Sequence, residues 1–447
     1  MKMSERENEG YRGNALRIIK EAGAEIGDIV SVTKGDETLE GTLIPRSQYE
    51  ADDYIVIKLR NGYNVGIRLS SEVKVRRVGK GVKPSFTLPP PPKQNPDLPK
   101  VTILSTGGTI ASRVDYRTGG VRPALTASDL YSVVPELSEI AQIDAKIVLS
   151  MFSENITPKD WSDIATAIEK EIVHGADGVV VAHGTDTMGY TAAAISFALQ
   201  NLPAPVVFVG SQRSADRPSS DAATNLVGAA FVAARAPFAE VGVAMHETSS
   251  DDSIVVHRGT RARKCHTSRR DAFSSVNSSP LARIKNNELT MLTQDFKRRN
   301  PKSRFIVKPH FEERVAMLKF YPGMDSGLID WLVDKSYRGL ILEGSGLGHI
   351  RRRCFDSLQN AVGGGVIVGM TSQCIWGRTN MNVYNTGRDL LALGIVSLED
   401  MLPETALVKL MWVLGQTSDT QEAKKMLKTN LAGELSPITL PEEVGAE

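Results

Sequence analysis

The sequence has 447 residues, of which 41% are hydrophobic and 23% are charged, and its formal net charge is +1. This length exceeds that of one ordinary hydrophobic core and predicts two or three domains. The nearly balanced charge excludes electrostatic wrapping of nucleic acid over the whole molecule, so any RNA contact must be local.

The cysteines and the amino terminus indicate the compartment. Three scattered cysteines are typical of a reducing cytosol and not of a disulfide framework. The first ten residues are polar, and no apolar run approaches the roughly 20 residues of a membrane span. We therefore expect a cytoplasmic protein without membrane contact.

Residues 1–83 are predicted to form a helix followed by a small β-barrel. Apolar residues recur at helical spacing between Tyr11 and Ala22, and Gly23 ends this pattern. Five short runs of β type come next, at 28–32, 39–44, 54–59, 63–68 and 73–78. Closure into a barrel is favoured because it removes exposed edges. The last run places cations on its outward side, as either an RNA or partner face or a solvated edge guarded by charge.

Prolines between 84 and 99 predict an extended linker, after which the pattern changes. Short apolar runs typical of strands buried on both faces occur at 101–104, 178–182, 206–209 and 241–244. Helical patterns separate them, and the clearest begins at Thr157-Pro158. This alternation predicts a doubly wound α/β domain over 100–290, with its site at the carboxyl ends of the strands.

A second, shorter series of the same kind has strands at 315–320, 339–342 and 366–369. It predicts another α/β domain over 313–440. The polar and basic stretch 291–312 is interpreted as the connection. The fold class is therefore α/β, with a two-lobed parallel-sheet module preceded by a small all-β barrel domain.

Two glycine-containing turns carry the candidate chemistry. The first strand of the large module runs into Ser105-Thr-Gly-Gly-Thr-Ile-Ala-Ser112, where the glycines permit a sharp turn that presents Thr109 beside free N–H groups. A phosphate-binding turn is the alternative, but the spacing of nucleotide-binding motifs is missing.

The second turn, Ala182-His-Gly-Thr-Asp-Thr-Met-Gly189, follows another buried strand. Thr185 is placed to activate a substrate and Asp186 to hold an α-amino group. Alone, this motif is equally consistent with a capped helix start, since Thr and Asp are good N-caps. Two such turns at neighbouring strand ends can converge on one small polar substrate.

A hydroxyl attacks an amide only if another group takes its proton. Lys264 is the candidate base, because neighbouring cations and desolvation favour a neutral amine. The alternative is a solvated basic face. Tyr116 lies shortly after Thr109 and is a candidate cover for it. The seven histidines do not fall at zinc-ligand spacings, so we expect no metal site.

Together these motifs resemble the bacterial-type L-asparaginase family from about residue 101 to residue 431. Thr-Gly-Gly-Thr-Ile-Ala at 106–111 and His-Gly-Thr-Asp-Thr at 183–187 are similar to the two signatures of that family. The resemblance implies that Thr109 is the nucleophile, that Tyr116 is its lid partner, and that a second catalytic cluster is formed by Thr185, Asp186 and Lys264.

The same resemblance implies a substrate-binding segment at Ser153 and Glu154, with Asp186 also contacting the substrate. Glu154 stands where many members of the family have Gln, and Leu347 stands where some have Asn. These two departures leave glutamine and asparagine both open as the preferred amide.

Plain asparaginases lack the N-terminal module, and the whole arrangement resembles the asparaginase-like subunits of archaeal tRNA-dependent amidotransferases. This resemblance implies an amidohydrolase that supplies ammonia for converting Glu-tRNA(Gln) to Gln-tRNA(Gln). It also implies that this chain holds no cofactor. The expected partner is the amidotransferase kinase/transamidase subunit, of the E type, which uses ATP and Mg. Contact with tRNA(Gln) is expected through the complex. A homodimer core within a heterotetramer is the expected assembly. The alternatives are a free L-asparaginase with an accessory barrel and a non-catalytic tRNA-binding or assembly subunit.

Overall fold

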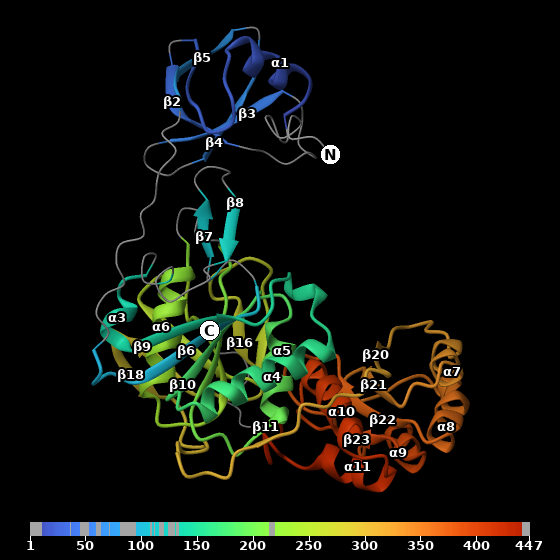
Figure 1. The fold of residues 1–447 in the computed structure, drawn as a ribbon. Helices are drawn as coiled ribbons and strands as arrows, with labels where there is room; N and C mark the ends of the chain where they lie inside the picture. The colour runs from blue at the N-terminus through green and yellow to red at the C-terminus, as the bar shows by residue number, and fades with distance from the viewer. Residues whose placement is uncertain are drawn as a thin grey trace.

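The protein was studied as a computed structural model, which contains a small N-terminal domain and a larger body of two lobes (Figure 1). The structure describes residues 11–35, 37–44, 53–59, 64–70, 72–80, 95–107, 110, 112–115, 120–123, 130, 134–213 and 220–439. Residues 84–94 of the predicted linker therefore lie outside the described residues.

The N-terminal domain is a helix on an antiparallel sheet, and its helix and five short strands are those that were predicted for a small β-barrel domain. It contains α1 (Gly13–Glu21), β1 (Ile29–Lys34), β2 (Glu37–Leu43), β3 (Tyr54–Lys58), β4 (Asn64–Arg68) and β5 (Val73–Gly79). The strand order is β4-β3-β2-β1-β5. Tyr11, Ile19, Val30 and Ile57 belong to the buried core that helix and strands share. Among the described residues no ladder joins β4 to β5, so hydrogen bonds do not close the sheet along that seam.

The outward cations predicted on the last strand of this domain divide into two kinds. Lys74 and Arg76 are exposed. Arg77 instead turns toward the body of the domain, where its Nε lies 2.9 Å from a carboxylate oxygen of Asp28. Of these three cations, Lys74 and Arg76 therefore form the outer face.

The first lobe of the body is built on an eight-stranded mixed sheet. Its strands are β6 (Lys100–Ser105), β9 (Gln142–Ile147), β10 (Gly178–Ala182), β12 (Val206–Val209), β13 (Val241–His246), β14 (Ser253–Arg258), β17 (Ala282–Lys285) and β18 (Glu288–Met291). The order is β18-β17-β14-β13-β12-β10-β6-β9. The five strands from β9 to β13 are parallel, which confirms the predicted doubly wound arrangement. The other three are antiparallel additions that the sequence patterns did not indicate.

Helices cover both faces of this sheet and so explain why its central strands are wholly apolar. α4 (Pro158–Val173) and α5 (Met188–Ala198) pack on one face, and α3 (Leu137–Ile140) and α6 (Ala222–Arg235) pack on the other. The predicted start of α4 is confirmed. There, the backbone N–H of Thr157 donates to the Asp160 carboxylate at 2.7 Å and Pro158 occupies the first turn.

The second lobe contains a four-stranded parallel sheet between two layers of helices. Its strands are β20 (Val315–Lys319), β21 (Gly339–Gly344), β22 (Ile367–Ser372) and β23 (Val396–Ser397). One layer consists of α7 (Gly327–Asp334), α8 (Phe355–Gly363) and α9 (Asn385–Ala392), whereas α10 (Pro403–Gln416) and α11 (Thr420–Lys428) form the other. Helix α10 also packs against α5, so apolar side chains of the two lobes belong to one buried cluster.

Several short elements complete the body. β11 (Leu199–Gln200) pairs with β19 (Ile306–Val307), β15 (Ala262–Lys264) pairs with β16 (Phe273–Ser275), and β7 (Ser112–Asp115) pairs with β8 (Gly120–Pro123). Two 3-10 turns, η2 (Ser153–Asn155) and η3 (Arg352–Cys354), lie in loops. The predicted connection thus contributes β19, which is paired to the first lobe.

Buried polar contacts join the two lobes. Arg261 and Asp400 form an ion pair with an N–O distance of 3.0 Å, and their side chains are 0% and 1% exposed. The hydroxyl of Thr405 donates to the backbone oxygen of Thr260 at 2.8 Å. An unpaired buried charge carries a large free-energy cost, so any arrangement of the lobes that separates Arg261 from Asp400 is disfavoured.

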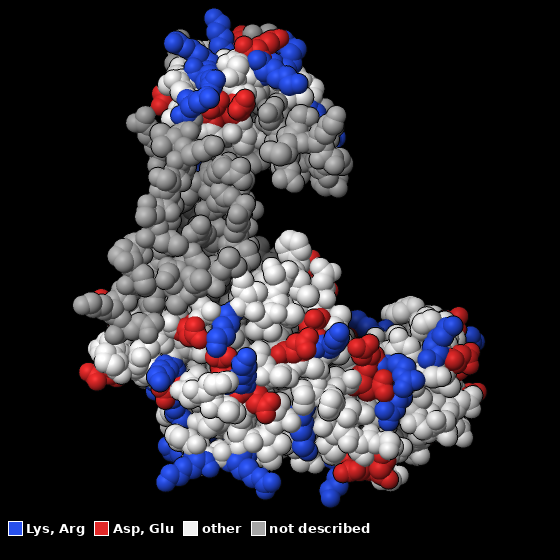
Figure 2. Space-filling model, in the orientation of Figure 1, with Lys and Arg blue, Asp and Glu red and all other residues white. Residues whose placement is uncertain are grey.

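The surface agrees with the balanced composition. Basic and acidic side chains are interspersed over the visible face of the larger body (Figure 2). All three cysteines are free. Within the described ranges, none of the helices is both long and apolar enough to cross a membrane.

Candidate active site

The two glycine-containing turns begin side by side at the carboxyl ends of neighbouring parallel strands. β6 and β10 are paired in register, with Ser105 opposite Ala182. Immediately beyond, the N–H and the hydroxyl of Thr106 both donate to the carbonyl oxygen of Ala182, at 3.0 Å and 3.1 Å. Thr106 is 1% exposed. The start of the first turn is therefore fixed against the start of the second.

Gly107 is required by the shape of the first turn. Its φ of +118° lies in the region that favours glycine, and a Cβ built there would lie 2.1 Å from the backbone oxygen of Met151. Thr109 and Tyr116 lie outside the described residues. Their roles as nucleophile and lid partner stay predictions.

The second turn carries a compact cluster of three side chains. Lys264, the last residue of β15, donates from Nζ to the hydroxyl oxygen of Thr185 at 2.9 Å and to the carboxylate of Asp186 at 2.7 Å. The Lys264 side chain is 15% exposed and that of Asp186 is 70% exposed. The mostly enclosed amine of Lys264 thus lies against the Thr185 hydroxyl, and the Asp186 carboxylate beside it faces solvent.

The arginines that precede Lys264 do not form a solvated face. Arg258 Nε pairs with Glu240 at 2.7 Å and Arg261 pairs with Asp400 at 3.0 Å, and both arginines are buried. Each guanidinium therefore has its own carboxylate. The neighbouring cations expected around Lys264 thus include two that are neutralised by buried ion pairs, and the role of Lys264 as base stays a prediction.

Ser153, one of the two residues expected to bind substrate, lies against the second turn. A Cβ added to Gly184 would come within 2.8 Å of its hydroxyl oxygen, and the Thr187 hydroxyl donates to its backbone oxygen at 2.7 Å. Thr187 precedes α5 but makes no side-chain cap bond to that helix. The alternative that this motif is only a helix cap is therefore not supported at Thr187. Glu154 is exposed next to Ser153.

Two residues that the sequence patterns did not single out support Thr185. A Cβ on Gly210, which follows β12, would lie 2.6 Å from the Thr185 methyl group, so only glycine fits there. His183 is 1% exposed, and its Nδ1 lies 2.7 Å from the backbone oxygen of Gly184. Burial lowers the pKa of His183 to about 4, so the ring is neutral near pH 7. In the sequence, the only indication of a role for His183 is its position directly before Gly-Thr-Asp.

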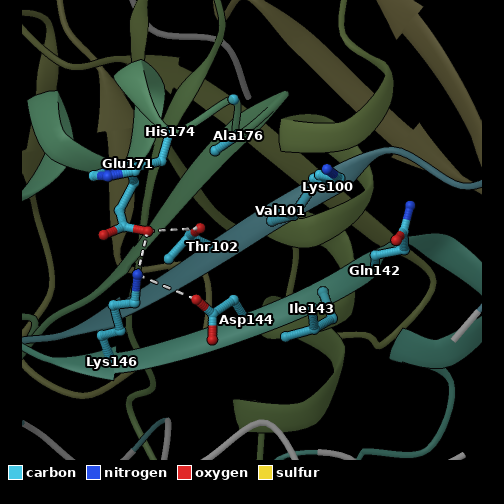
Figure 3. A pocket seen from close by; sticks show the side chains of 11 residues that line it. Lys100, Val101, Thr102, Gln142, Ile143, Asp144, Lys146, Glu171, His174 and Ala176 are labelled. Atoms are coloured by element: carbon cyan, nitrogen blue, oxygen red, sulfur yellow. Dashed lines mark hydrogen bonds and ion pairs between the residues drawn. The ribbon is translucent and has the colours of Figure 1, made fainter. Parts of the chain in front are cut away.

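A separate polar pocket of about 420 Å³ lies near the amino end of β6 (Figure 3). The two turns instead follow the carboxyl ends of β6 and β10. Lys146 Nζ lies 2.6 Å from the nearly buried Glu171 carboxylate and 3.2 Å from that of Asp144. The hydrogen bond to Glu171 is the main reason that the pKa of Lys146 is raised. The charge of Lys146 is therefore compensated by two carboxylates of the same pocket.

The contacts among Lys264, Thr185 and Asp186 suit proton transfer. Across the ranges that the structure describes, no group of three or more His, Cys, Asp or Glu side chains is arranged to hold a metal ion. A lysine, a hydroxyl and a carboxylate in contact are components that a nucleophilic amide hydrolase uses.

Family models match three parts of the chain. They are described as "Asparaginase, N-terminal" over 100–297, "Glutaminase/Asparaginase C-terminal domain" over 314–427 and "GatD N-terminal domain" over 24–78. Among solved structures, the thermostable L-asparaginase from Thermococcus kodakarensis is similar with a TM-score of 0.69 and 32% identity, over 76% of this chain and 100% of that one. L-asparaginase I from Vibrio cholerae has a TM-score of 0.67 and 31% identity, over 76% and 99%. The fold and site thus define an asparaginase-type α/β amidohydrolase.

Two curated relatives extend the similarity over nearly the full length. The D subunit of glutamyl-tRNA(Gln) amidotransferase from Metallosphaera sedula is 51% identical over 96% of this chain and 97% of the relative. The protein of the same name from Pyrococcus furiosus is 50% identical over 95% and 98%. This chain belongs to the family of glutamyl-tRNA(Gln) amidotransferase D subunits.

Proposed function

We propose that this chain is the amide-hydrolysing subunit of a glutamyl-tRNA(Gln) amidotransferase and releases ammonia from glutamine, or from asparagine in its place. The observation that carries the proposal is the contact of Lys264 with Thr185 and Asp186 beside the first glycine turn. The similarity of the chain to the amidotransferase D subunits over almost its whole length supports the assignment to the complex.

In the proposed reaction, the Thr109 hydroxyl attacks the carboxamide carbon, the C–N bond breaks and ammonia leaves with the transferred proton, so an acyl-enzyme remains. Water then hydrolyses the acyl-threonine, which releases the acid and restores the hydroxyl. Thr185 and a neutral Lys264 accept the proton from the attacking hydroxyl. In the structure, Lys264 Nζ donates to the Thr185 hydroxyl oxygen at 2.9 Å. Once the amine has lost a proton, the Thr185 hydroxyl donates to the Lys264 nitrogen in the same contact. Backbone N–H groups of the turns stabilise the oxyanion, and one such donor is worth about 3 kcal/mol.

Binding of the amino-acid part of the substrate is assigned to the exposed carboxylate of Asp186 and to the segment of Ser153 and Glu154. Asp186 faces solvent from the same cluster as Lys264. A substrate ammonium group that binds Asp186 competes with Lys264 for this carboxylate. Substrate binding would then favour the neutral amine that the proposed reaction requires.

The released ammonia is consumed in a partner subunit that uses ATP and Mg to activate tRNA-bound glutamate, within a heterotetramer built on a homodimer of this chain. Because loss of ammonia to water is wasteful, hydrolysis should be slow until the complex holds charged tRNA. A coupling free energy of about 1 to 3 kcal/mol would change the rate roughly 5- to 150-fold.

A free L-asparaginase with an accessory domain is less well supported. The two similar asparaginase structures are covered almost completely by about three quarters of this chain, whereas the amidotransferase D subunits match it over almost its whole length. A non-catalytic tRNA-binding subunit is disfavoured because Thr185, Asp186 and Lys264 are all present and in contact.

The decisive experiment measures ammonia release from glutamine and from asparagine by the purified chain. It is repeated with the kinase/transamidase partner and with Glu-tRNA(Gln). We expect slow release by the chain alone and a rise of about 5-fold or more with partner and charged tRNA. Full activity of the isolated chain would refute the coupling, and no release under any condition would refute the function.

The N-terminal domain is assigned to the partner or to the tRNA, because the two asparaginase family models match only residues 100–297 and 314–427 of the chain. Removal of residues 1–92 should leave amide hydrolysis by the chain alone within about twofold while impairing transamidation in the complex. Unchanged transamidation by the shortened chain would exclude this role.

A further inference from the structure

Five polar side chains form a continuous path of contacts between the segment after β12 and the β15–β16 hairpin. Arg270 donates from a guanidinium nitrogen to Asp251 at 2.6 Å, and the same carboxylate oxygen lies 3.0 Å from His246 Nε2. His246 Nδ1 lies 2.6 Å from Asn225 Oδ1, and Asn225 Nδ2 donates to Asp221 at 3.0 Å. Asp221, Asn225 and His246 are each 0% exposed.

One end of this path holds the loop that supports Thr185. The Asp221 carboxylate accepts the backbone N–H groups of Gln212 and Arg213 at 3.0 Å and 2.9 Å. Asn225 Nδ2 also donates to the backbone oxygen of Gly210 at 2.9 Å. Gly210 is the residue whose missing Cβ leaves room for the Thr185 methyl group.

The other end of the path holds the hairpin that carries Lys264. Arg270 lies in the turn between β15, which ends at Lys264, and β16. The N–H of Cys265 bonds to the oxygen of Ala272 across the mouth of this turn. The path therefore connects the supports of the two side chains that meet at the proposed site.

The hydrogen bonds determine the charge of His246. The three groups that Asn225 Nδ2 contacts are the Gly210 oxygen, the Asp221 carboxylate and the Met245 sulfur, and all three accept. Asn225 Oδ1 must therefore face His246, and Nδ1 of the ring must carry a hydrogen. Asp251 is exposed, and the carboxylate oxygen that faces Nε2 also accepts from the Arg270 guanidinium, so it accepts from Nε2 as well. A ring that donates from both nitrogens is an imidazolium.

We propose that His246 is a positioning residue, held as a buried imidazolium between Asp251 and Asn225, that keeps Thr185 and Lys264 in register for amide hydrolysis. The effect of His246 on the rate of amide hydrolysis rests on the proposed function. The charge of His246 does not rest on it. Loss of the Asp251 charge would leave the imidazolium without its counter-ion, so the ring would become neutral and one connection of the path would break.

Adjacent residues in the chain provide matched controls. Asp251→Asn and Arg270→Gln each remove one charge of the path. The control Asp252→Asn removes a neighbouring carboxylate that pairs with Lys285. The control Arg269→Gln removes a neighbouring guanidinium that pairs with Asp271. We expect the first two variants, in the full complex, to lower kcat for glutamine about tenfold with KM changed less than about twofold, because a small displacement of reacting groups acts on the rate. Both control variants should stay within about twofold of the wild type.

Combining Asp251→Asn with Arg270→Gln should lower kcat no further than either change alone, since both break the same path. An unchanged kcat in the single variants, or an equal loss in the controls, would overturn the positioning role. Thermal unfolding of every variant shows whether a loss of rate comes from a loss of folded protein.

The charge of His246 is tested independently by nitrogen-15 histidine NMR on the full chain, with the His246 signals assigned by their loss in His246→Gln. Both ring nitrogens should carry hydrogen at pH 7 in the wild type, and only one in Asp251→Asn. Amide hydrogen exchange at Gln212 and Arg213 should become faster in Asp251→Asn and not in Asp252→Asn. A singly protonated ring in the wild type, or unchanged exchange, refutes the inference even if the chain releases no ammonia and the proposed function is wrong.

Discussion

Lys264 Nζ lies 2.9 Å from the hydroxyl oxygen of Thr185, although 79 positions separate the two residues in the chain. This contact joins the end of β15 to the turn after β10. It is the most direct structural support for a proton-transfer pair in the described part of the molecule.

Thr185→Ala and Lys264→Met should each lower kcat for ammonia release by about 100- to 10,000-fold, the range typical of lost general acid–base catalysis. Far-ultraviolet circular dichroism should be unchanged, since Thr185 and Lys264 are both partly exposed. Thr166→Ala, on the exposed side of α4, is the matched control. Near-normal turnover in either site variant would exclude these residues from the chemistry.

Thr109→Ala should abolish ammonia release altogether, because it removes the proposed nucleophile and not only its activation. The expected result is activity at the detection limit together with retained binding of the amide, measured by calorimetry. A variant that still turns over glutamine at a substantial fraction of the wild-type rate would assign the nucleophile elsewhere.

Gly107→Ala should destabilise the first turn and reduce activity with it. The φ of +118° strains any other residue, and the added carbon would clash with the Met151 oxygen. We expect a loss on the order of 3 kcal/mol in the free energy of unfolding, measured with urea. Gly175→Ala has a similar positive φ but open space around its Cβ, so its smaller cost would measure the strain alone.

Asp400→Ala should weaken the joint between the lobes, because it leaves the buried guanidinium of Arg261 unpaired. The expected loss in the free energy of unfolding is about 3 to 5 kcal/mol. Asp389→Ala breaks an exposed ion pair with Arg352 in the second lobe and should cost below about 1 kcal/mol. Equal effects of the two substitutions in thermal unfolding would contradict the joint assigned to Arg261.

The stability of the protein should fall as the pH decreases from about 6.5 toward 4. Burial lowers the pKa of His257 from 6.5 to about 4, so in this window the unfolded chain binds a proton that the folded chain does not. Stability is therefore full above the unfolded pKa and decreases below it, by about 2 kcal/mol between pH 7 and pH 5 for this residue. His257→Asn should show a correspondingly shallower decrease in urea unfolding, and an identical slope would show that His257 does not titrate in this way.

The sequence by itself determined the parallel framework and the type of chemistry. Strands buried on both faces must be apolar along their whole length, so the runs at 178–182 and 206–209 were recognisable without a structure. The start of α4 at Thr157-Pro158 is a local signal of the same kind. Glycine-containing turns at strand ends then limited the candidate site to a few residues.

Only the tertiary structure decided which side chains meet. The antiparallel strands β17 and β18 have half-exposed, partly polar sequences that resemble loops. They become strands because β14 offers an edge to β17, and β17 in turn offers an edge to β18. The basic stretch around Lys264 resembled a solvated face until the partners of Arg258 and Arg261 were known. Propensity and periodicity report on neighbours within a few residues, whereas ion pairs and the path through His246 depend on segments that only folding brings together.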